Sequence, residues 1–315
     1  MKIYIAPMAG ITDYAFRSIL KKFNPDLIFT EMVNANLVNI NDVNTFNTLL
    51  KRDGDESVQV FGSGKERLVD AFLKLESIGI KHLELNMGCP KTKIIKTGAG
   101  SALLPEKENM TDLLETLRSQ LSDNTELSIK IRTGFRDFHE PEFYINLANR
   151  LNLKYICVHG RTREQEYSGI ADWDLVSRLS KIDRKIDFIG NGDLFDVDKI
   201  MTVINSSNLD GVLLARGIIG NPWLITQLRE KLNNGVVKTL PSLDDIKNII
   251  IKHYELSHAN KGEKLTCLEM NKFVKYYFKD YPHLNEQLNS IILDYNYLDI
   301  GLSTLFRTIF IRSFF

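Results

Sequence analysis

The sequence predicts an α/β fold, a (β/α)8 TIM barrel followed by a small all-helical C-terminal domain. Two observations lead to this prediction. Eight short apolar runs alternate with helix-like stretches between Ile3 and Ala215, whereas no strand pattern interrupts the helical patterns after Gly235. The length of 315 residues suits one large domain plus a small appendage. A doubly wound open sheet is the structural alternative, because the number of strands alone separates the two folds poorly.

The expected strands are runs rich in β-branched and aromatic residues. Because these runs are apolar throughout, they are typical of parallel strands with both faces buried. Eight such strands in a domain of about 250 residues match a TIM barrel. In chain order they are IYIA from Ile3, LIFT from Leu27, VQVF from Val58, LELN from Leu83, LSIKI from Leu127, YICVH from Tyr155, IDFIG from Ile186 and GVLLA from Gly211.

Polar residues stand at the ends of these runs. In a TIM barrel the carboxyl ends of all strands meet at one rim, where the active site is built. Contact with solvent explains some of the polar positions, but not a lysine, a histidine and two asparagines inside or against apolar runs. We therefore expect a functional site at this rim, with Pro7, Met8, Glu31, Gln59, Asn86, Lys130, His159, Asn191 and Arg216.

The chain after Pro241 has the pattern of helices alone. Ser242 is a candidate N-cap, and apolar residues follow it at helical spacing. The predicted division is a barrel domain over 1–237 and a helical domain over 238–315. The helical positions are Ile246, Ile249, Ile250 and His253 or Tyr254, then Leu265, Leu268, Phe273, Val274 and Tyr277, then Leu284, Leu288, Ile291, Leu302, Leu305 and Ile309.

Composition excludes several classes of protein. Hydrophobic residues make up 43% and charged residues 25%, as in ordinary globular proteins. No apolar run approaches the roughly 20 residues of a membrane helix, and no secretory signal is visible. The formal net charge is +0, so a basic surface for nucleic acid has to be local. Three unpaired cysteines argue against a disulfide framework and a cysteine-ligated zinc, and favour a reducing cytoplasm.

Two loops near the end of the barrel have the features of a phosphate site. The sequence GVLLARGIIG over 211–220 is a strand that leads into a glycine-containing turn, and IGNGD over 189–193 ends the preceding strand. The loops after strands 7 and 8 of TIM barrels commonly bind phosphate through backbone N–H groups. Turns that need glycine for backbone reasons alone are the alternative, but the two loops in this order favour phosphate binding.

The motif NMGCP places Cys89 in a turn at the rim. A lone cysteine is usually a small apolar core residue, which is the interpretation for Cys157 and Cys267. Cys89 differs because Gly88 and Pro90 flank it, and there it could be a proton donor, a nucleophile or a redox thiol. The lysine-rich loop that follows, over 91–104, suits an anionic substrate or is simply solvated.

Lys130 and His159 complete the expected ring of polar groups. A lysine within a parallel strand is costly to bury unless it meets an anion, such as a phosphate or the electron-rich edge of a flavin. A core histidine bonded to backbone is the alternative for His159.

These motifs together resemble the tRNA-dihydrouridine synthases and, among their subfamilies, the bacterial B type. Any one of the motifs is weak, but the ordered set over about 220 residues is specific. The helical tail also matches the RNA-binding domain of that family in placement and length. The motifs are APMAGITD from Ala6, VQVFGS from Val58, NMGCP from Asn86, GSALL from Gly100, KIRTG from Lys130, VHGRTREQ from Val158, GNGD from Gly190 and GNPW from Gly220.

The resemblance implies FMN-dependent reduction of specific uridines in tRNA to 5,6-dihydrouridine, with NADPH or NADH as reductant. Hydride reaches carbon 6 of the uracil, Cys89 protonates carbon 5 as general acid, and Asn86 bonds the base. The nucleotide has to leave its stack to lie on the flavin. The FMN contacts that the resemblance implies are Pro7, Met8 and Ala9 along the flavin, Gln59, Lys130 and His159 at its ring system, and Asn191, Gly192, Asp193, Ala215 and Arg216 at the ribityl-phosphate end.

A tRNA substrate implies phosphate contacts from local cations. Three lysines in the helical tail fall at i, i+3 and i+7, on one face of a helix, although a solvated lysine face has the same pattern. The expected protein is a cytoplasmic monomer with no metal. The expected tRNA contacts are Lys91, Lys93, Lys96, Arg132, Arg161 and Arg163 near the barrel mouth, and Lys272, Lys275 and Lys279 in the tail.

One position departs from the family. The family usually has glycine where this chain has Ala215, and a positive φ there would strain alanine.

Three other functions share parts of the pattern. The alternatives are an FMN barrel oxidoreductase of a small molecule, a tRNA-binding protein that acts as a folding chaperone, and a flavin-free phosphosugar barrel. The lysine-flanked Cys89 loop and the RNA-sized tail argue against the first, and intact Cys89, Lys130 and His159 argue against the second.

Overall fold

The computed structural model describes residues 1–136 and 140–281, and its centre is a parallel sheet. Each of the eight predicted runs contains a strand, and a short additional strand follows the second run. The nine strands are β1 (Lys2–Ile5), β2 (Leu27–Ile28), β3 (Val33–Asn34), β4 (Val58–Phe61), β5 (His82–Met87), β6 (Glu126–Gly134), β7 (Tyr155–Thr162), β8 (Asp187–Asn191) and β9 (Gly211–Leu214).

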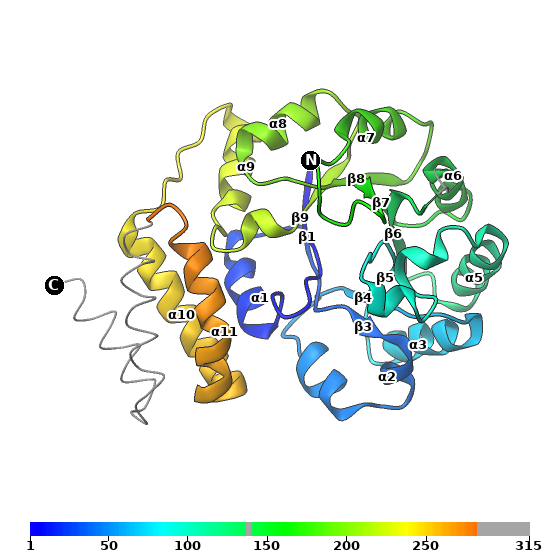
Figure 1. The fold of residues 1–315 in the computed structure, drawn as a ribbon, viewed down its shortest axis with the longest axis horizontal. Helices are drawn as coiled ribbons and strands as arrows, with labels where there is room; N and C mark the ends of the chain where they lie inside the picture. Colours follow the sequence, from blue (N-terminus) through cyan, green and yellow to red (C-terminus); the bar gives the residue numbers. More distant parts are fainter. Residues whose placement is uncertain (137–139, 282–315) are drawn as a thin grey trace. The chain divides into compact units, whose positions relative to one another are not determined.

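The sheet curls until its two ends meet (Figure 1). Its strand order is β2-β1-β9-β8-β7-β6-β5-β4-β3. Ser57, just before β4, donates its N–H to the carbonyl of Ile28 at 2.9 Å and accepts from the N–H of Thr30 at 2.9 Å. These bonds join the two ends, so β2 and β3 together occupy the second strand position. The predicted (β/α)8 barrel is confirmed.

Amphipathic helices surround the sheet (Figure 1). Helix α3, for example, buries Leu68, Phe72 and Leu75 on one side. Aspartate side chains cap two of the helices, because Asp172 accepts from the N–H of Leu175 and Asp196 from that of Lys199. The helices around the sheet are α2 (Ala35–Asn39), α3 (Lys65–Ser77), α4 (Thr92–Ile95), α5 (Lys107–Gln120), α6 (Pro141–Arg150), α7 (Trp173–Ser180) and α8 (Val197–Asn205).

Apolar and aromatic side chains fill the inside of the barrel. Cys157 belongs to this core, with no exposed surface, which confirms that it is a small apolar residue. His82 is also buried there, between the hydroxyls of Ser57 and Ser128, and burial lowers its pKa to about 3. The barrel is therefore a packed core rather than a channel, and ligands have to bind at its ends.

The chain forms two compact units. The first unit is Met1–Tyr14 with Pro25–Arg216, and the second is Ala15–Asn24 with Gly217 onward. The predicted division at 237/238 stays a prediction. The second unit contains most of α1 (Tyr14–Leu20), with α9 (Leu224–Asn234), α10 (Leu243–Lys261) and α11 (Glu263–Tyr277).

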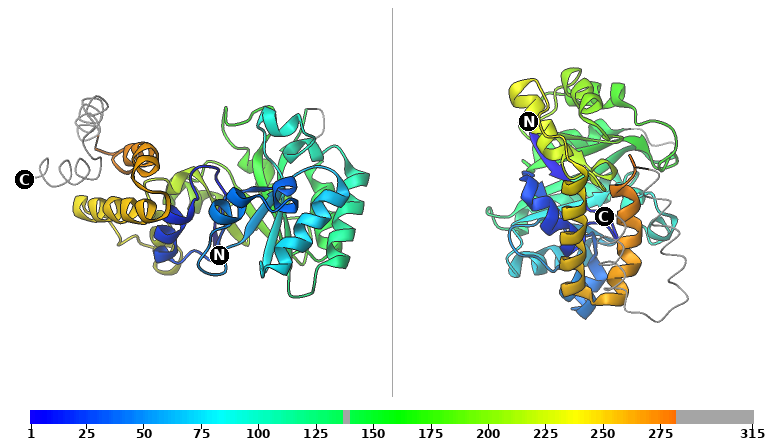
Figure 2. Two further views of the ribbon diagram at one scale, coloured as in Figure 1. Left: turned by 90° about the horizontal axis from the view of Figure 1, so that it is seen from below. Right: turned by 90° about the vertical axis from the view of Figure 1, so that its left-hand side faces the viewer.

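Helices α10 and α11 lie side by side (Figures 1 and 2). The predicted cap of α10 is confirmed, because Ser242 and Asp245 form a reciprocal capping box. The predicted helical pattern from Leu265 to Tyr277 is confirmed by α11, although Leu265 is 52% exposed and Leu268 is 63% exposed. At about 100° per residue both leucines point roughly 140–160° away from Met270, which lies in the buried stripe.

Part of the sequence prediction falls on residues that the structure does not describe. The helical patterns at Leu284, Leu288 and Ile291 and at Leu302, Leu305 and Ile309 lie outside the described ranges. Within residues 1–136 and 140–281, no helix has both the length and the apolar character that crossing a membrane requires.

Candidate active site at the carboxyl ends of the strands

The register of the strands brings the predicted polar residues of the first unit together. Asn86 pairs with Lys130 across β5 and β6. His159 pairs with Arg132 on one side and with Asn191 on the other. Neighbouring parallel strands thus present these side chains at one end of the barrel, as the sequence predicts.

The Cys89 turn is held by hydrogen bonds from two directions. The Oδ1 atom of Asn86 accepts from the N–H of Gly88 at 3.1 Å and from that of Cys89 at 2.9 Å. From the other side, Ser101 donates its N–H at 3.1 Å and its hydroxyl at 2.9 Å to the Cys89 carbonyl. A Cβ at Gly100, whose φ is +65°, would lie 2.8 Å from that carbonyl oxygen. The GSALL segment therefore needs glycine to support the turn.

The Cys89 thiol is half-buried and protonated at neutral pH. Burial raises its pKa, and the N–H of Lys91 with the charges of Arg132 and Lys130 lowers the pKa only in part. Of the three roles open to this cysteine, a neutral thiol fits a proton donor better than a nucleophilic thiolate.

Lys130 and His159 offer polar nitrogens that have no partner among residues 1–136 and 140–281. Among the residues that the structure describes, Lys130 has no hydrogen-bond or ion-pair partner, and its side chain is half-buried. The Nε2 atom of His159 is buried and has no hydrogen-bond partner in the same described ranges. Burial first, and then the nearby charges of Lys130 and Arg132, hold the pKa of His159 well below its ordinary value. The imidazole is therefore neutral and able to contact a ligand.

Asp193 joins the loops that follow β7, β8 and β9. Its carboxylate accepts two hydrogen bonds from Arg161, at 2.9 and 2.6 Å, one from Arg216 at 3.0 Å and one from the N–H of Ala171 at 2.9 Å. Burial alone raises the pKa of Asp193, but the Arg161 bonds and the N–H of Ala171 outweigh it and hold that pKa below its ordinary value. The two loops that the sequence assigns to phosphate are thus held next to each other.

The backbone conformation of these loops shows whether Ala215, where the family usually has glycine, adopts a positive φ. Gly192 has a φ of +126° and Asp193 a φ of +50°, whereas Ala215 does not adopt a positive φ. The strain expected from alanine at this position is therefore absent.

Replacing Arg161 by methionine should lower the free energy of unfolding by about 3 kcal/mol, because it leaves the Asp193 carboxylate, whose side chain is only 13% exposed, without its main partner. Arg161 is 2% exposed, whereas the Arg216 side chain is 42% exposed, so Arg216→Met should lower that free energy by less than about 1 kcal/mol. Urea unfolding of both variants measures the difference. The loss of stability in Arg161→Met should shrink as the pH falls from the ordinary carboxyl pKa toward the lowered pKa of Asp193. A lowered folded-state pKa stabilises the protein fully only above the ordinary pKa, and this stabilisation is lost as the pH falls through the lowered one. Equal losses in the two variants would contradict this account.

Two of the predicted tRNA contacts bond extensively to their own chain. Arg132 is 2% exposed and donates to the carbonyls of Gly88, Thr162 and Glu166. Arg161 donates to two carbonyls of the loop after β7 in addition to Asp193. Burial lowers the pKa of Arg132 to about 10, so it stays charged at neutral pH. These arginines position the loops, and a contact with RNA stays a prediction for both.

The other predicted contacts of the first unit are more accessible. Lys91, Lys93 and Lys96 are exposed on the segment after β5 that contains α4, and Arg163 is half-buried above the Phe135 ring. The predicted flavin contacts Pro7, Met8 and Ala9 lie in the segment after β1, which enters a turn at Ala9, and the N–H of Met8 donates to the Thr12 hydroxyl.

The three predicted lysines of the second unit do not share one helix. Lys272 and Lys275 lie on α11, but this helix ends at Tyr277, so Lys279 lies in the turn beyond it. The expectation of one helical face at i, i+3 and i+7 is therefore wrong for Lys279.

Sequence reasoning missed several residues near the site. Glu84 and Tyr155 form a buried polar chain with Gln59 below the rim, and the charge of Glu84 inside an apolar run was a signal of the same kind as Lys130. Tyr167 is 46% exposed, and its ring lies 5.1 Å from Lys91 Nζ and 5.2 Å from Arg216 Cζ. No pattern in the sequence places Tyr167 there, since the loop after β7 decides it.

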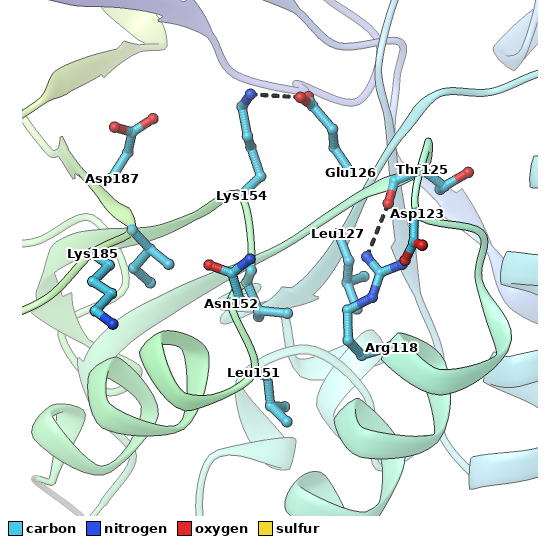
Figure 3. A pocket seen from close by; sticks show the side chains of 12 residues that line it. Arg118, Asp123, Thr125, Glu126, Leu127, Leu151, Asn152, Lys154, Lys185 and Asp187 are labelled. Carbon is cyan, nitrogen blue, oxygen red and sulfur yellow. Dashed lines mark hydrogen bonds and ion pairs between the residues drawn. The ribbon is translucent and has the colours of Figure 1, made fainter.

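A pocket of about 570 Å³ lies at the opposite end of the first unit (Figure 3). Glu126 and Asp187, where β6 and β8 begin, line it, and Lys154 forms an ion pair with Glu126 at 2.5 Å. Arg118 donates to the carbonyl of Thr125 in the same wall. This pocket contains none of the predicted site residues. In the described ranges, no group of three or more His, Cys, Asp or Glu side chains is placed to hold a metal ion.

Comparison with known proteins agrees with the motifs. The sequence model of the family described as "Dihydrouridine synthase (Dus)" matches residues 4–294. The chain belongs to the dihydrouridine synthase family. It is 32% identical over 288 residues to the "Probable tRNA-dihydrouridine synthase" of Rickettsia conorii (strain ATCC VR-613 / Malish 7), which covers 90% of this chain and 86% of that protein.

A relative of the B type and a solved structure complete the comparison. The chain is 29% identical over 289 residues to "tRNA-dihydrouridine synthase B" of Pseudomonas syringae pv. tomato (strain ATCC BAA-871 / DC3000), covering 90% of this chain and 84% of that one. Among solved structures, the 6-hydroxypseudooxynicotine amine oxidase of Pseudomonas geniculata N1 matches with a TM-score of 0.51 at 10% identity. That match covers 82% of this chain and about half, 52%, of the oxidase, and it supports the fold.

Proposed function

We propose that this chain reduces uridines in tRNA to 5,6-dihydrouridine. Membership of the dihydrouridine synthase family gives the reaction class. The observation that carries the proposal is the Cys89 turn, held by hydrogen bonds to Asn86 and Ser101 at the same rim as Lys130 and His159. Burial raises the pKa of its thiol, as a proton donor requires. A tRNA substrate also implies that the protein works in the cytoplasm.

The residues at the rim fit FMN as cofactor. The buried Nε2 atom of His159 lacks a partner, and Lys130 meets no acid by an ion pair in the described part of the chain. Gly192 has a φ of +126° and leaves room beside His159 that a Cβ would fill, 3.0 Å from its Cδ2 atom. When bound at these residues, FMN reduced by NADPH or NADH would supply hydride chemistry for carbon 6 of the uracil. The proposed contacts are Pro7, Met8, Ala9, Gln59, Lys130, His159, Asn191, Gly192, Asp193, Ala215 and Arg216.

The chain's own residues complete the reduction. The Cys89 sulfur gives its proton to carbon 5 of the uracil, and its raised pKa keeps that proton in place at neutral pH. Lys130 supports negative charge that develops beside it, because its ammonium has no ion-pair partner among the described residues. Asn86 lies next to the Cys89 turn; its Nδ2 group gives one hydrogen to Gln59, and its other hydrogen is the one proposed to bond the base.

Binding of the tRNA is proposed to rest on local cations, since the whole chain is neutral. In the first unit the exposed Lys91, Lys93 and Lys96 are the candidates, together with Arg163. In the second unit the candidates are Lys272, Lys275 and Lys279.

Changing Lys272, Lys275 and Lys279 together to glutamate should weaken tRNA binding and leave the flavin bound. If all three contact phosphate, the slope of log K against log salt falls by roughly 2–3. Filter binding of tRNA at several salt concentrations measures this slope. The matched control changes Lys81, Lys181 and Lys185, exposed residues of the first unit, to glutamate. Equal tRNA affinity and slope in both variants would make the three tail lysines a solvated face.

The proposed reaction can be tested in cells. Expression of this chain in a bacterial strain without dihydrouridine synthases should restore dihydrouridine to its tRNA, measured by nucleoside mass spectrometry. Expression of the Cys89→Ala variant at the same level should not. No dihydrouridine from either chain would contradict the proposal.

A further inference from the structure

A chain of buried hydrogen bonds runs from the inside of the barrel to the Cys89 turn. The hydroxyl of Tyr155 donates to Glu84 Oε2 at 2.8 Å, and Gln59 Nε2 donates to Glu84 Oε1 at 2.5 Å. Asn86 Nδ2 donates in turn to Gln59 Oε1 at 2.6 Å, and Asn86 Oδ1 accepts from the N–H of Cys89. Every link is formed inside the first unit.

The direction of this chain depends on its first acceptor. Both oxygens of Glu84 accept hydrogen bonds, one from the Tyr155 hydroxyl and one from Gln59, so Gln59 turns its NH2 group toward Glu84. Its carbonyl then faces Asn86, which turns its own NH2 group toward Gln59. The remaining oxygen of Asn86 consequently faces the Cys89 turn, where the backbone offers N–H donors. A flip of either amide would set donor against donor along the chain.

We propose that Glu84 is a positioning residue that holds the Cys89 turn in place by fixing the orientation of the Gln59 and Asn86 amides. The catalytic meaning of this role rests on the proposed function of Cys89. Glu84 has no exposed surface and lies on β5 two residues before Asn86, so both side chains point to the same face of the strand. It acts through other residues and does not itself need to touch a substrate.

The carboxyl group of Glu84 accepts hydrogen bonds from two donors, Tyr155 and Gln59, in a fully buried position. Burial raises its pKa, while the bonds from Gln59 and Tyr155 and the charge of Lys130 act in the opposite direction. Buried polar chains of this kind are stable only when every donor meets an acceptor. Removing the acceptor therefore affects the far end of the chain and not only its neighbours.

The test uses amide hydrogen exchange at Gly88 and Cys89. In Glu84→Gln the new amide can turn its oxygen to Gln59 and its NH2 group to the Tyr155 hydroxyl, which can accept, so exchange should change less than about threefold. In Tyr155→Phe the hydrogen bonds that link Glu84 to the Cys89 turn remain. The amide exchange rates of Gly88 and Cys89 should therefore also change less than about threefold. In the double variant the new amide lacks that acceptor and competes for Gln59 Oε1, so exchange should accelerate about tenfold or more.

This non-additive result separates positioning from mere packing. A structural role alone predicts that the double variant shows the product of the two single effects. Exchange at Leu85 on β5 should stay within about threefold of wild type, which shows that the strand itself remains intact. Glu84→Leu should also accelerate exchange at Cys89, but the proposal does not depend on that variant folding.

The outcome does not depend on the reaction, because exchange is measured without tRNA. Additive effects at Cys89, or acceleration at Leu85 equal to that at Cys89, would overturn the positioning role. If the double variant also makes dihydrouridine with a lower kcat and an unchanged KM, the position of Cys89 matters for the chemical step. A wild-type protein that makes no dihydrouridine would remove the proposed function and leave the exchange result standing.

Discussion

The Cys89→Ala variant should form dihydrouridine about 10²–10⁴ times more slowly than the wild type, because a positioned general acid contributes a factor of this size. Binding of FMN and of tRNA should be retained, since the Asn86 and Ser101 bonds that hold the turn go to the backbone of residue 89 and not to its side chain. Single-turnover assays with nucleoside mass spectrometry measure the rate, and flavin absorbance and tRNA filter binding measure the two affinities.

A control variant and the pH dependence of the wild type show whether the effect comes from the Cys89 thiol. Cys157→Ala removes a buried core thiol that faces no substrate, so it should lower stability and leave the rate of dihydrouridine formation per folded molecule unchanged. In the wild type, activity should fall as the pH rises through the raised pKa of Cys89, because only the protonated thiol donates. A rate that is unchanged in Cys89→Ala would remove this residue from the mechanism.

The Gly220→Ala variant should lose about 3 kcal/mol or more of unfolding free energy within the second unit. Gly220 has a φ of +73°, and a Cβ there would lie 2.2 Å from the carbonyl carbon of Tyr276 and 2.5 Å from the backbone nitrogen of Tyr277. Backbone atoms of α11 cannot move aside as a flexible side chain does. The GNPW motif therefore carries glycine because the backbone of α11 packs directly on it.

Gly235 provides the matched control for this prediction. Its φ is +74°, nearly the same as that of Gly220, but no atom of the described residues lies within 4 Å of the place that a Cβ would take. Gly235→Ala thus isolates the backbone strain, which costs about 1–2 kcal/mol, from the steric clash. Urea unfolding of both variants measures the difference. Equal losses would show that the contact with α11 adds nothing to the strain.

The sequence was sufficient to predict the barrel because each strand is a continuous apolar run. It was less informative where tertiary contacts decide. The run LIFT, for example, forms only two residues of strand at Leu27–Ile28, since the closing bonds to Ser57 occupy the next positions. On α11 the apolar Leu265 and Leu268 are exposed because the buried stripe passes through Met270 and Phe273 instead. Hydrophobicity alone does not determine which side of a helix is covered.

In the candidate site, too, some contacts could be predicted from the sequence and others depend on tertiary structure. Polar residues at strand ends, such as Asn86 and His159, could be predicted to meet because parallel strands share one end. The partners of Arg132 could not be predicted from the sequence, because the conformation of the loops brings its three carbonyl acceptors together from separate segments. The buried chain below Cys89 likewise depends on the register that sets Gln59 beside Glu84.

The proposed reaction is tested most directly by incubating the purified protein with unmodified tRNA, FMN and NADPH and measuring dihydrouridine by nucleoside mass spectrometry. We expect dihydrouridine to appear with the wild type, at defined uridines, and at least about 10²-fold more slowly with Cys89→Ala. A yellow protein that oxidises NADPH but forms no dihydrouridine would contradict the proposed reaction and favour reduction of a small molecule. A colourless protein without product would contradict the FMN assignment as well.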